Sequence, residues 1–521
     1  MESSPRPNLR EVAGHWVANA RRRQSLEDGD KFSFLNETGR LSELCWNGPE
    51  REKLWRYNQH YFDDLNAADA DARSDWHQVL IKRWVYENKL GVGTGWEPYP
   101  TSLRIVNWVK YLLAGRSISQ ECLQSLAIQT RWLSRRIEWH ILGNHLFANA
   151  KALVFSGLCF EGPEARKWLD IGIGIIAKEL PEQVLPDGGN FERSTMYHAI
   201  FLEDLLDLIN LAGAFPGVVA LKQMDQWRTI AIKMLEWLEA MCHPDGEIAF
   251  FNDAAIGVAP SPLEIRAYAS RLGIAVGQKD SSSRNPTVIR FADSGYIRLS
   301  ALNAVAFLDV ALIGPDYLPG HAHADTLSFE LSLFGERVLV NGGTSQYGSG
   351  PVRLHERGTE AHNTVVINGK NSSEVWSGFR VARRAYPRDL VVDQVDQSIS
   401  VSCAHDGYRR LPSQAVHKRS WQLSPGKLVV QDRIVGEFKT AVAHFHFHPD
   451  IKVTIIGHRT YSLCLSGTGQ EIQFVVLNGA ASIRQGGYAP EFGIYLKSQC
   501  LAVRFESNDD IAVEISWCID E

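Results

Sequence analysis

A change in hydrophobic period just past the middle of the chain constrains its fold more than any other feature. From about 55 to 275, apolar residues recur three and four positions apart, as in segments 125–141 and 165–180, which predicts amphipathic helices. From about 288 to 518, short apolar and β-branched runs follow one another without helical segments between them. Such runs predict antiparallel sheets. We therefore expect a helical domain followed by a β domain.

The joints between the predicted segments refine this organisation. Short Gly, Pro and Asp joints between helices of similar length predict an all-α array of helical hairpins, and the strands predict a large β-sandwich. The polar, breaker-rich run at 277–287 predicts a linker. We expect a polar lead-in over 1–40, a helical domain over 41–276 and a β domain over 288–521.

Charge and hydropathy exclude several partners. The net charge of −6 with no basic block argues against nucleic acid, because phosphate binding requires clustered Lys and Arg. No stretch approaches the roughly 20 apolar residues of a membrane span. The N-terminus has no apolar core of a signal peptide, so a cytoplasmic location is expected, with a periplasmic or secreted mature form left open. The oligomeric state is open.

The cysteine spacing argues against one kind of site, and the tryptophan content suits another. The eight cysteines include no CxxC pair, which argues against a cysteine zinc site and favours buried thiols. The 15 tryptophans suit stacking on sugar rings, although core packing explains most single residues of this kind. Trp96, in the breaker-flanked segment 93–100, is open to both interpretations.

The stretch His321-Ala-His323-Ala-Asp325 concentrates chemistry in five residues. The following run, 326–333, alternates apolar and polar residues as a half-buried strand does. Extended geometry from His321 onward would place both histidines and Asp325 on one face, with a bend near 325–326 as an alternative. Two histidines and a carboxylate so arranged suit proton transfer, metal binding or both.

A second polar segment spans 187–198, with paired glycines that allow close backbone approach. If the residues after them are helical, Asn190, Arg193 and Tyr197 share a face. A neighbouring guanidinium would lower the pKa of Tyr197 below its ordinary value of about 10 and make the phenol a usable base. An ordinary packing contact between Arg193 and Tyr197 is the alternative.

Two further residues lie at the expected starts of elements. Asn144 stands at the predicted start of a helix, where an N-cap role is the structural alternative to a functional one. His362 stands at the entrance of a predicted strand and is a candidate ligand or orienting group for His321 and His323.

Taken together and in order, five segments resemble the heparinase II/III-like polysaccharide lyases. They are 144–149, 187–198, 320–333, 337–348 (RVLVNGGTSQYG) and 362–364. The resemblance implies an incomplete (α/α) toroid joined to an antiparallel β-sandwich. It also implies β-elimination on an acidic, uronic-acid-containing polysaccharide.

The resemblance also assigns roles to residues. It implies that Asn144 neutralises the uronate carboxylate and that Tyr197 and His321 transfer protons, in an active site between the two domains. The remaining residues expected to bind substrate are His145, Asn190, Glu192, Arg193 and Trp96.

Some members of this family hold zinc near the site, and the resemblance matches His323 to one ligand. Asn341 stands where those members have an aspartate, and an amide oxygen is a weaker zinc ligand than a carboxylate. His362 could complete such a set. We therefore expect no required cofactor, and a structural role for zinc if it binds.

Two alternatives keep the same residues. A uronate C5-epimerase needs the same proton abstraction but returns a proton to the opposite face and leaves O4 bonded. A non-catalytic glycan-binding protein of a polysaccharide-synthesis system needs only the binding surface.

Overall fold

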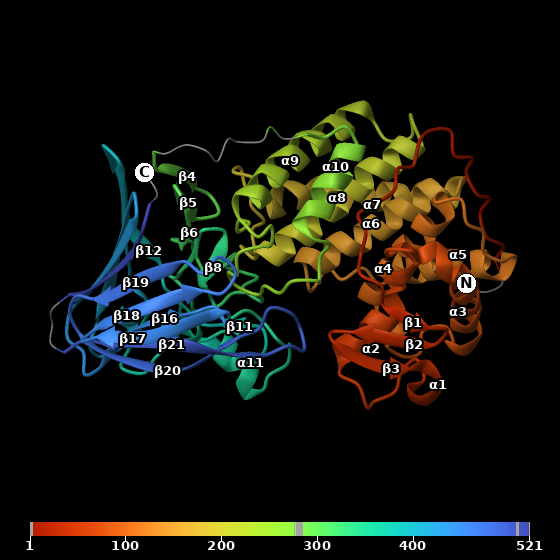
Figure 1. Cartoon of the computed structure of the whole chain (residues 1–521). Helices are drawn as coiled ribbons and strands as arrows, with labels where there is room; N and C mark the ends of the chain where they lie inside the picture. The colour runs from red at the N-terminus through yellow and green to blue at the C-terminus, as the bar shows by residue number, and fades with distance from the viewer. Residues whose placement is uncertain (1–3, 276, 278–284, 507–509, 520–521) are drawn as a thin grey trace. The chain divides into compact units, whose positions relative to one another are not determined.

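The chain forms two compact units, which are described separately (Figure 1). The computed structural model describes residues 4–275, 277, 285–506 and 510–519, so 278–284 of the predicted linker lie outside the described residues. The first unit comprises Met1–Val184, Ala199–Leu235 and Gly257–Val276. The second comprises Leu185–His198, Glu236–Ile256 and Gly277–Glu521, so it includes two stretches from the helical half of the sequence.

Helices dominate the first half of the chain, which confirms the predicted helical region. Their bounds are α1 (Leu41–Leu44), α2 (Lys53–Tyr61), α3 (Ser74–Glu87), α4 (Pro98–Leu113), α5 (Gln120–Leu133), α6 (Gly143–Cys159), α7 (Pro163–Gln183), α8 (Thr195–Ala214), α9 (Leu221–Ala240) and α10 (Pro262–Arg271). Within the stretch expected as a polar lead-in, β1 (Leu26–Asp28), β2 (Lys31–Phe34) and β3 (Glu37–Arg40) form a small antiparallel sheet. Among the described residues, none of the helices combines the length and apolar character needed to cross a membrane.

Helix α6 is the buried centre of this helical region. Nearly all of its side chains are buried, and it packs against α4, α5 and α7. The approach of α7 is close: a Cβ added to Gly157 of α6 would lie 2.6 Å from the backbone nitrogen of Leu169, and one added to Gly172 of α7 would lie 2.7 Å from the Ala150 carbonyl oxygen. Glycine is required at both positions because any side chain would push the two helices apart.

Antiparallel sheets make up the second half, as predicted. Five strands are joined in chain order: β4 (Thr287–Phe291), β5 (Tyr296–Ala301), β6 (Ala304–Asp309), β7 (Phe329–Leu333) and β8 (Glu336–Leu339). The largest sheet has the order β12 (Pro387–Val395), β13 (Ser398–His405), β14 (Val416–Ser424), β15 (Lys427–Val435), β22 (Ile511–Trp517), β19 (Glu471–Val476), β18 (Thr460–Leu465) and β17 (Ile451–Gly457). A third has the order β20 (Ala480–Tyr488), β21 (Leu496–Arg504), β16 (Ala441–His446) and β9 (Val365–Ile367). This half also contains the β10–β11 hairpin (Val375–Trp376 and Arg380–Val381), the short helix α11 (Pro351–Glu356) and two 3-10 helices (Thr359–Ala361 and Gly407–Arg410).

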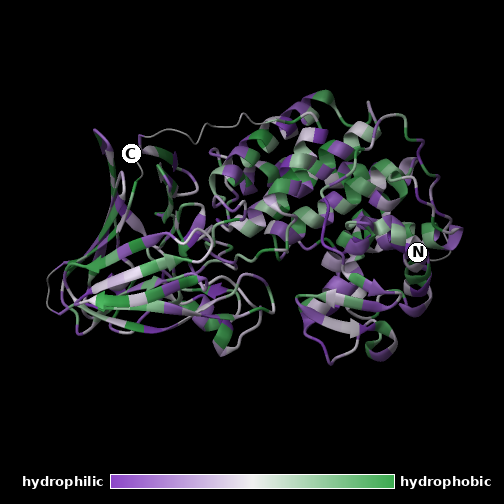
Figure 2. Cartoon of the chain, in the orientation of Figure 1, coloured by the Kyte–Doolittle hydropathy of each residue, from purple (hydrophilic) through white to green (hydrophobic). Residues whose placement is uncertain are grey.

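These three larger sheets share one apolar core. Buried side chains such as Leu299, Trp421 and Phe445 come from a different sheet each and belong to the same cluster. Along β14 and β15, buried and exposed residues alternate, as expected of strands with one face on a core. Figure 2 shows the same banding of hydrophobic and hydrophilic residues along the strands.

The histidine-rich stretch differs from its prediction. Strand β7 begins only at Phe329, and residues 321–328 form a loop with Leu327 at φ +64°. The Ser328 N–H donates to the Asp325 carbonyl over 2.8 Å, which closes a turn where the alternation of residues predicted a continuous strand. The prediction of one extended face from His321 to Asp325 is therefore wrong, and the bend near 325–326 is what forms.

The α6–α7 contact makes a testable prediction. Gly157→Ala should lower the free energy of unfolding by about 1–3 kcal/mol, since the new methyl group overlaps the backbone of α7. Gly174→Ala is the matched control, because Gly174 is exposed in α7 and an added Cβ meets open space within the described chain. It should be neutral or stabilise the helix by up to about 1 kcal/mol. Urea unfolding followed by far-ultraviolet circular dichroism measures both, and equal behaviour of the two variants would contradict the close approach.

Candidate active site

A buried aspartate, Asp253, is the hub of the candidate site in the second unit. Its carboxylate accepts hydrogen bonds from His321 Nδ1 at 2.8 Å and from His323 Nε2 at 2.8 Å. The guanidinium of Arg353 binds both carboxylate oxygens, with Nη2 2.7 Å from Oδ2. Asp253 and Arg353 are fully buried, so the ion pair is shielded from water. Three side chains are thus oriented by one carboxylate.

Burial and charge act in opposite directions on this hub. Burial alone would raise the pKa of Asp253, but Arg353 and the hydrogen bonds from the two histidines lower it well below its usual value. Burial lowers the pKa of His323 to about 4 against the opposing effect of Asp253. At neutral pH the hub is therefore an ionised carboxylate, a guanidinium and a neutral His323 imidazole.

Backbone contacts hold the segment that carries Asp253. The Phe250 N–H donates to Glu330 at 2.8 Å, and the Asn252 N–H donates to Asp325 at 3.2 Å. The Asn252 side-chain oxygen accepts the N–H of His323 at 3.0 Å. Asp325 therefore helps to position the segment before the hub.

Two tyrosines and His321 form the accessible side of the site. The Tyr197 ring stacks on the His321 imidazole with centroids 3.8 Å apart, and its hydroxyl lies 2.9 Å from the hydroxyl of Tyr347. Nε2 of His321 lies 3.5 Å from a carboxylate oxygen of Glu192. Tyr197 is half-buried and the His321 side chain is 13% exposed, so a ligand can reach both. The structure thus brings together Tyr197, His321 and Glu192, as the sequence led us to expect.

The segment before Tyr197 is a loop, which corrects one structural expectation. Helix α8 begins at Thr195, and Arg193 has φ +59°, so Asn190, Arg193 and Tyr197 do not share a helical face. The buried Arg193 guanidinium donates through Nε to the Ser294 carbonyl at 3.1 Å. The Asn190 side chain accepts the Glu192 N–H at 3.0 Å. Asn190 and Arg193 therefore hold the loop that presents Glu192 and Tyr197.

Asn144 and His145 belong to the first unit and lie in the first turn of α6. The N-cap of α6 is Leu142, so the N-cap interpretation of Asn144 is wrong. His145 stacks on Tyr99, with centroids 4.3 Å apart, and its Nδ1 lies 3.2 Å from Glu138. Asn144 is half-buried, which leaves its carboxamide partly accessible at the start of the helix.

Trp96, the third expected residue of this unit, packs in a cluster of aromatic rings. It is 5% exposed, its ring centroid lies 5.4 Å from that of Trp84 and 5.7 Å from that of Trp132, and its Nε1 donates to the Asn88 carbonyl. These contacts and the burial favour the packing interpretation of Trp96 over stacking on a sugar ring.

The three residues matched to a zinc site are buried, and each contacts the chain around it. His323 Nδ1 lies 3.1 Å from His362 Nε2, and His362 Nδ1 lies 2.7 Å from the Gly358 carbonyl, which accepts its hydrogen bond. The Asn341 carboxamide donates to the Phe250 carbonyl at 2.8 Å and accepts the Asn363 N–H at 3.2 Å. His362 therefore lies directly against His323, and its role as a ligand or an orienting group stays a prediction.

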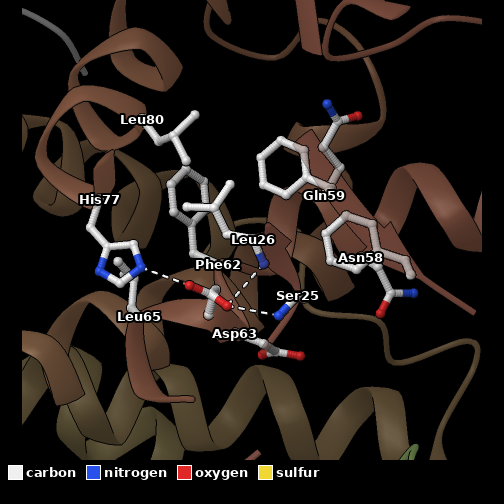
Figure 3. Close-up of a pocket in the computed structure, with 12 residues that line it drawn as sticks. Ser25, Leu26, Asn58, Gln59, Phe62, Asp63, Leu65, His77 and Leu80 are labelled. Carbon is white, nitrogen blue, oxygen red and sulfur yellow. Dashed lines mark hydrogen bonds and ion pairs between the residues drawn. The ribbon is translucent and has the colours of Figure 1, made fainter. Parts of the chain in front are cut away.

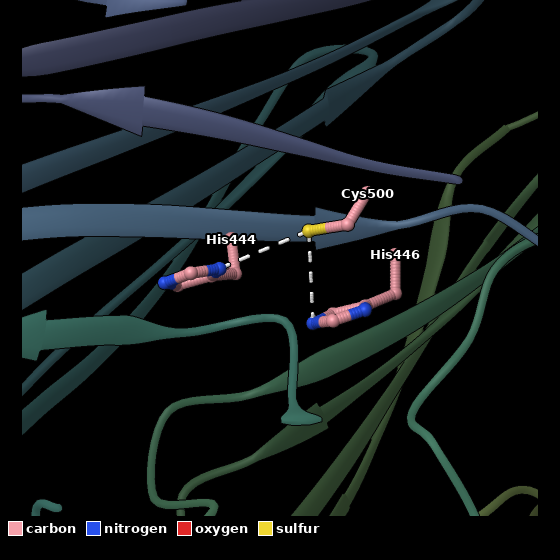
Figure 4. A group of neighbouring side chains, drawn as sticks. All are labelled: His444, His446 and Cys500. Atoms are coloured by element: carbon pink, nitrogen blue, oxygen red, sulfur yellow. Dashed lines mark hydrogen bonds between the residues drawn. The ribbon is translucent and has the colours of Figure 1, made fainter. Parts of the chain in front are cut away.

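A different group could hold a metal ion. In the described part of the chain, His444, His446 and Cys500 place one donor atom each within 4.8 Å of the others, and all three are buried (Figure 4). Burial lowers the pKa of His444 to about 3 and that of His446 to about 4, and it raises the pKa of the Cys500 thiol to about 12.

A small cavity of about 20 Å³ in the first unit is too small for a sugar (Figure 3). It has room for about one water molecule. Beside it, the Asp64 carboxylate accepts hydrogen bonds from the backbone of Ser25 and Leu26, and it lies 2.8 Å from His77 Nε2. The cavity therefore lies among the residues that hold the β1–β3 sheet in place.

Sequence reasoning missed three members of the site. Asp253 follows the apolar run 248–251, and an Asn-Asp pair directly after such a run is the signal that could have found it. Tyr347 lies inside the segment 337–348 that carried the resemblance, but it had no role of its own. Arg353 had no local signal, since only the fold brings it to Asp253.

The fold and the site define a protein in which a helical region is followed by antiparallel sheets, and whose second unit contains a histidine–tyrosine site. Residues 79–267 match the family model described as Heparinase II/III N-terminus, and residues 283–517 match the one described as Heparinase II/III-like, C-terminal. The chain belongs to the heparinase II/III-like family.

Similar proteins agree with this assignment. The chain is 27% identical over 448 residues to the heparin-sulfate lyase of Bacteroides stercoris, across 76% of this chain and 64% of that protein. It is 24% identical over 381 residues to the heparin-sulfate lyase of Pedobacter heparinus, across 65% of this chain and 56% of that protein. The chain therefore spans less than two thirds of the length of these relatives. A crystal structure of heparinase III has the same fold, with a TM-score of 0.69 and 19% identity over 88% of this chain and 76% of that one.

The Asp253 hub makes a prediction about stability and pH. Asp253→Asn should destabilise the protein by about 3–5 kcal/mol at neutral pH, because Arg353 loses its buried partner. The pKa of Asp253 is lower in the folded protein than in the unfolded chain, where it is about 3.9. The ionised carboxylate therefore contributes fully to the free energy of unfolding above about pH 3.9, and this contribution is lost as the pH falls below that value. The stability difference between wild type and variant should therefore shrink below about pH 4. Unfolding curves measured across this pH range test it, and a difference independent of pH would contradict the ionised hub.

Proposed function

We propose that this protein is a polysaccharide lyase that cleaves a uronic-acid-containing glycan by β-elimination. The observation that carries the proposal is the set of contacts joining Asp253, His321, Tyr197 and Tyr347. Elimination requires removal of the C5 proton of the uronate and protonation of the departing O4. Two adjacent proton-transfer groups of suitable chemistry supply these steps.

His321 is oriented for proton transfer by Asp253. Because the carboxylate is ionised and lies at Nδ1, it accepts a hydrogen bond from Nδ1–H, which leaves the lone pair on Nε2. When Nε2 takes up a proton, the Glu192 carboxylate 3.5 Å away stabilises the resulting positive charge. Asp253 therefore acts as a positioning residue, and His321 exchanges the proton.

Tyr197 is the partner of His321 in the transfer. Burial raises the pKa of Tyr347 well above its usual value, so Tyr347 remains a phenol and can donate to the oxygen of Tyr197. That hydrogen bond favours the phenolate form of Tyr197. We assign removal of the C5 proton and protonation of O4 to Tyr197 and His321 together.

The uronate carboxylate must be neutralised as negative charge develops beside it. We assign this role to Asn144, on the family resemblance and on the partial exposure of its carboxamide. The relatives named heparin-sulfate lyases support an acidic polysaccharide as substrate.

The proposed reaction predicts the nature of its product and the activity of two variants. Incubation with uronic-acid polysaccharides, heparan sulfate among them, should yield fragments with a C4–C5 double bond that absorbs ultraviolet light. Tyr197→Phe and His321→Ala should each lower kcat by about 10²–10⁴-fold, the usual contribution of one acid–base group. Tyr495→Phe is the control, because that tyrosine is 51% exposed and lies outside the contacts described above.

The outcomes separate the alternatives. A product with a changed C5 configuration and no double bond would show a uronate C5-epimerase and not a lyase. Saturable glycan binding without any product would show a non-catalytic glycan-binding protein. Full activity of both variants would refute the assignment of Tyr197 and His321 even if the double bond forms.

The second prediction concerns Tyr347. Tyr347→Phe removes the hydrogen bond to the Tyr197 oxygen, and such a bond to a charged form contributes about 1.5–3 kcal/mol. The limb of the pH–rate profile governed by Tyr197 should therefore move about one to two units toward higher pH. This direction holds whether Tyr197 acts as base or acid, because its pKa rises in both cases. A lower kcat with an unshifted profile would assign Tyr347 a packing role instead.

A further inference from the structure

The group His444, His446 and Cys500 lies on one face of two paired strands. His444 and His446 are two residues apart in β16, so their side chains point to the same side of the sheet. Cys500 of β21 is the direct cross-strand partner of His446. The alternation and the register thus bring two imidazoles and a thiol to one place, as Figure 4 shows.

The donor atoms are close but not in ideal contact with one another. Cys500 Sγ lies 3.8 Å from His444 Nδ1 and 3.8 Å from His446 Nε2. Such separations are weak for hydrogen bonds of a thiol. The separation from His444 Nδ1 matches the spacing of neighbouring ligands around a tetrahedral ion with bonds of about 2.0–2.3 Å, whereas His446 would bind through its other nitrogen, Nδ1.

One of the imidazoles is only partly engaged. His446 Nε2 lies 2.8 Å from the Glu360 carbonyl, whereas its Nδ1, within the described residues, is buried without a hydrogen-bond partner. A metal-bound histidine characteristically coordinates through one nitrogen and donates to a carbonyl through the other. His446 has both a carbonyl acceptor and an uncommitted nitrogen.

Space is available beside these ligands. Gly486 of β20 has no side chain, and a Cβ placed there would lie 3.3 Å from His446 Nδ1 and 3.4 Å from Cys500 Cβ. The same Cβ would lie 2.9 Å from Ser498 Oγ, a second buried polar atom without a partner in the described chain. A hydroxyl in that position can serve as a further metal ligand, or it can donate a hydrogen bond to the thiolate.

We propose that His444, His446 and Cys500 bind one thiophilic divalent ion of the zinc class. Thiolate and imidazole select such ions over Mg²⁺ and Ca²⁺, which prefer oxygen ligands. Cys500 binds as the thiolate and releases its proton to solvent. Three protein ligands leave one position of a tetrahedral ion for water or Ser498.

The ion would stabilise the strands that contact residues 360–364, which lie beside the candidate active site. The His444 N–H donates to the Thr364 carbonyl at 3.0 Å, and the His446 N–H donates to the Asn363 side chain at 2.6 Å. Residues 360–364 also carry His362, whose Nε2 lies 3.1 Å from His323. A metal joining β16 to β21 therefore stabilises the strand that holds this segment, and its role is structural.

Metal content of the full-length protein tests the proposal. After treatment with a chelator, dialysis against Zn²⁺ should load one ion per chain in the wild type. Cys500→Ser and His446→Gln should weaken Zn²⁺ binding at least about tenfold, because each removes a direct ligand. Gly486→Val should do the same by filling the space without removing a ligand.

Two controls locate the ion. Cys242→Ser removes another buried thiol, one that donates to the Leu238 carbonyl, and should bind Zn²⁺ like the wild type. His323→Asn should also retain the ion, which separates this group from the His323–His362 pair. Loss of Zn²⁺ in His323→Asn with retention in Cys500→Ser would overturn the proposal.

A spectroscopic measurement on the wild type makes the test independent of how well the variants fold. Co²⁺ in place of Zn²⁺ should give the near-ultraviolet charge-transfer band of a thiolate ligand, and addition of Zn²⁺ but not Mg²⁺ should abolish it. Zn²⁺ should also raise the unfolding temperature of the stripped protein. Absence of the thiolate band, or of Zn²⁺ binding in the wild type, would refute the site whatever the activity on glycans.

Discussion

The buried ion pair between Asp253 and Arg353 is the interaction on which the rest of the site depends. Two charges in a shielded environment are stable only when they are well paired and hydrogen-bonded, and here each carboxylate oxygen has an additional histidine partner. The same carboxylate orients His321, which can be reached by a ligand, and His323, which cannot. One ionised group thereby links the face that contains His321 and Tyr197 to the buried His323.

The coupling extends outward in both directions. Toward the accessible side, His321 stacks on Tyr197, and Tyr197 contacts Tyr347. Toward the interior, His323 contacts His362, and the neighbouring Asn363 holds β16 through the backbone of His446. The candidate metal group lies at this interior end, so a structural ion there would stabilise residues that never touch a substrate.

Some of this organisation could be predicted from the sequence, and the reasons are physical. The change from helical to strand periodicity predicted the order of the two halves, because burial of one face imposes a period on every element. The motifs around Tyr197 and His321 were recognisable because their residue types are concentrated in short segments. Asp253 and Arg353 were not, since they are 100 positions apart and meet only in the folded chain.

Local errors had a common cause. The alternation after His321 predicted a strand, but the turn closed by Asp325 and Ser328 delays β7 to Phe329. The shared face of Asn190, Arg193 and Tyr197 required a helix from Asn190 onward, but α8 begins at Thr195 and the loop before it is held by the buried contacts of Arg193. In both places a segment held by tertiary hydrogen bonds, from Asn252 to Asp325 and from Arg193 to Ser294, departs from the pattern along the chain, as is common beside functional sites.

The central claim is that Asp253 organises the proton transfer, and one comparison tests it most directly. Asp64 is a matched carboxylate, buried and paired with Arg73 and His77 in the first unit. Turnover per folded molecule, measured as formation of unsaturated product, should fall by at least about 10²-fold in Asp253→Asn and stay close to wild type in Asp64→Asn. Equal turnover in the two variants would contradict the account.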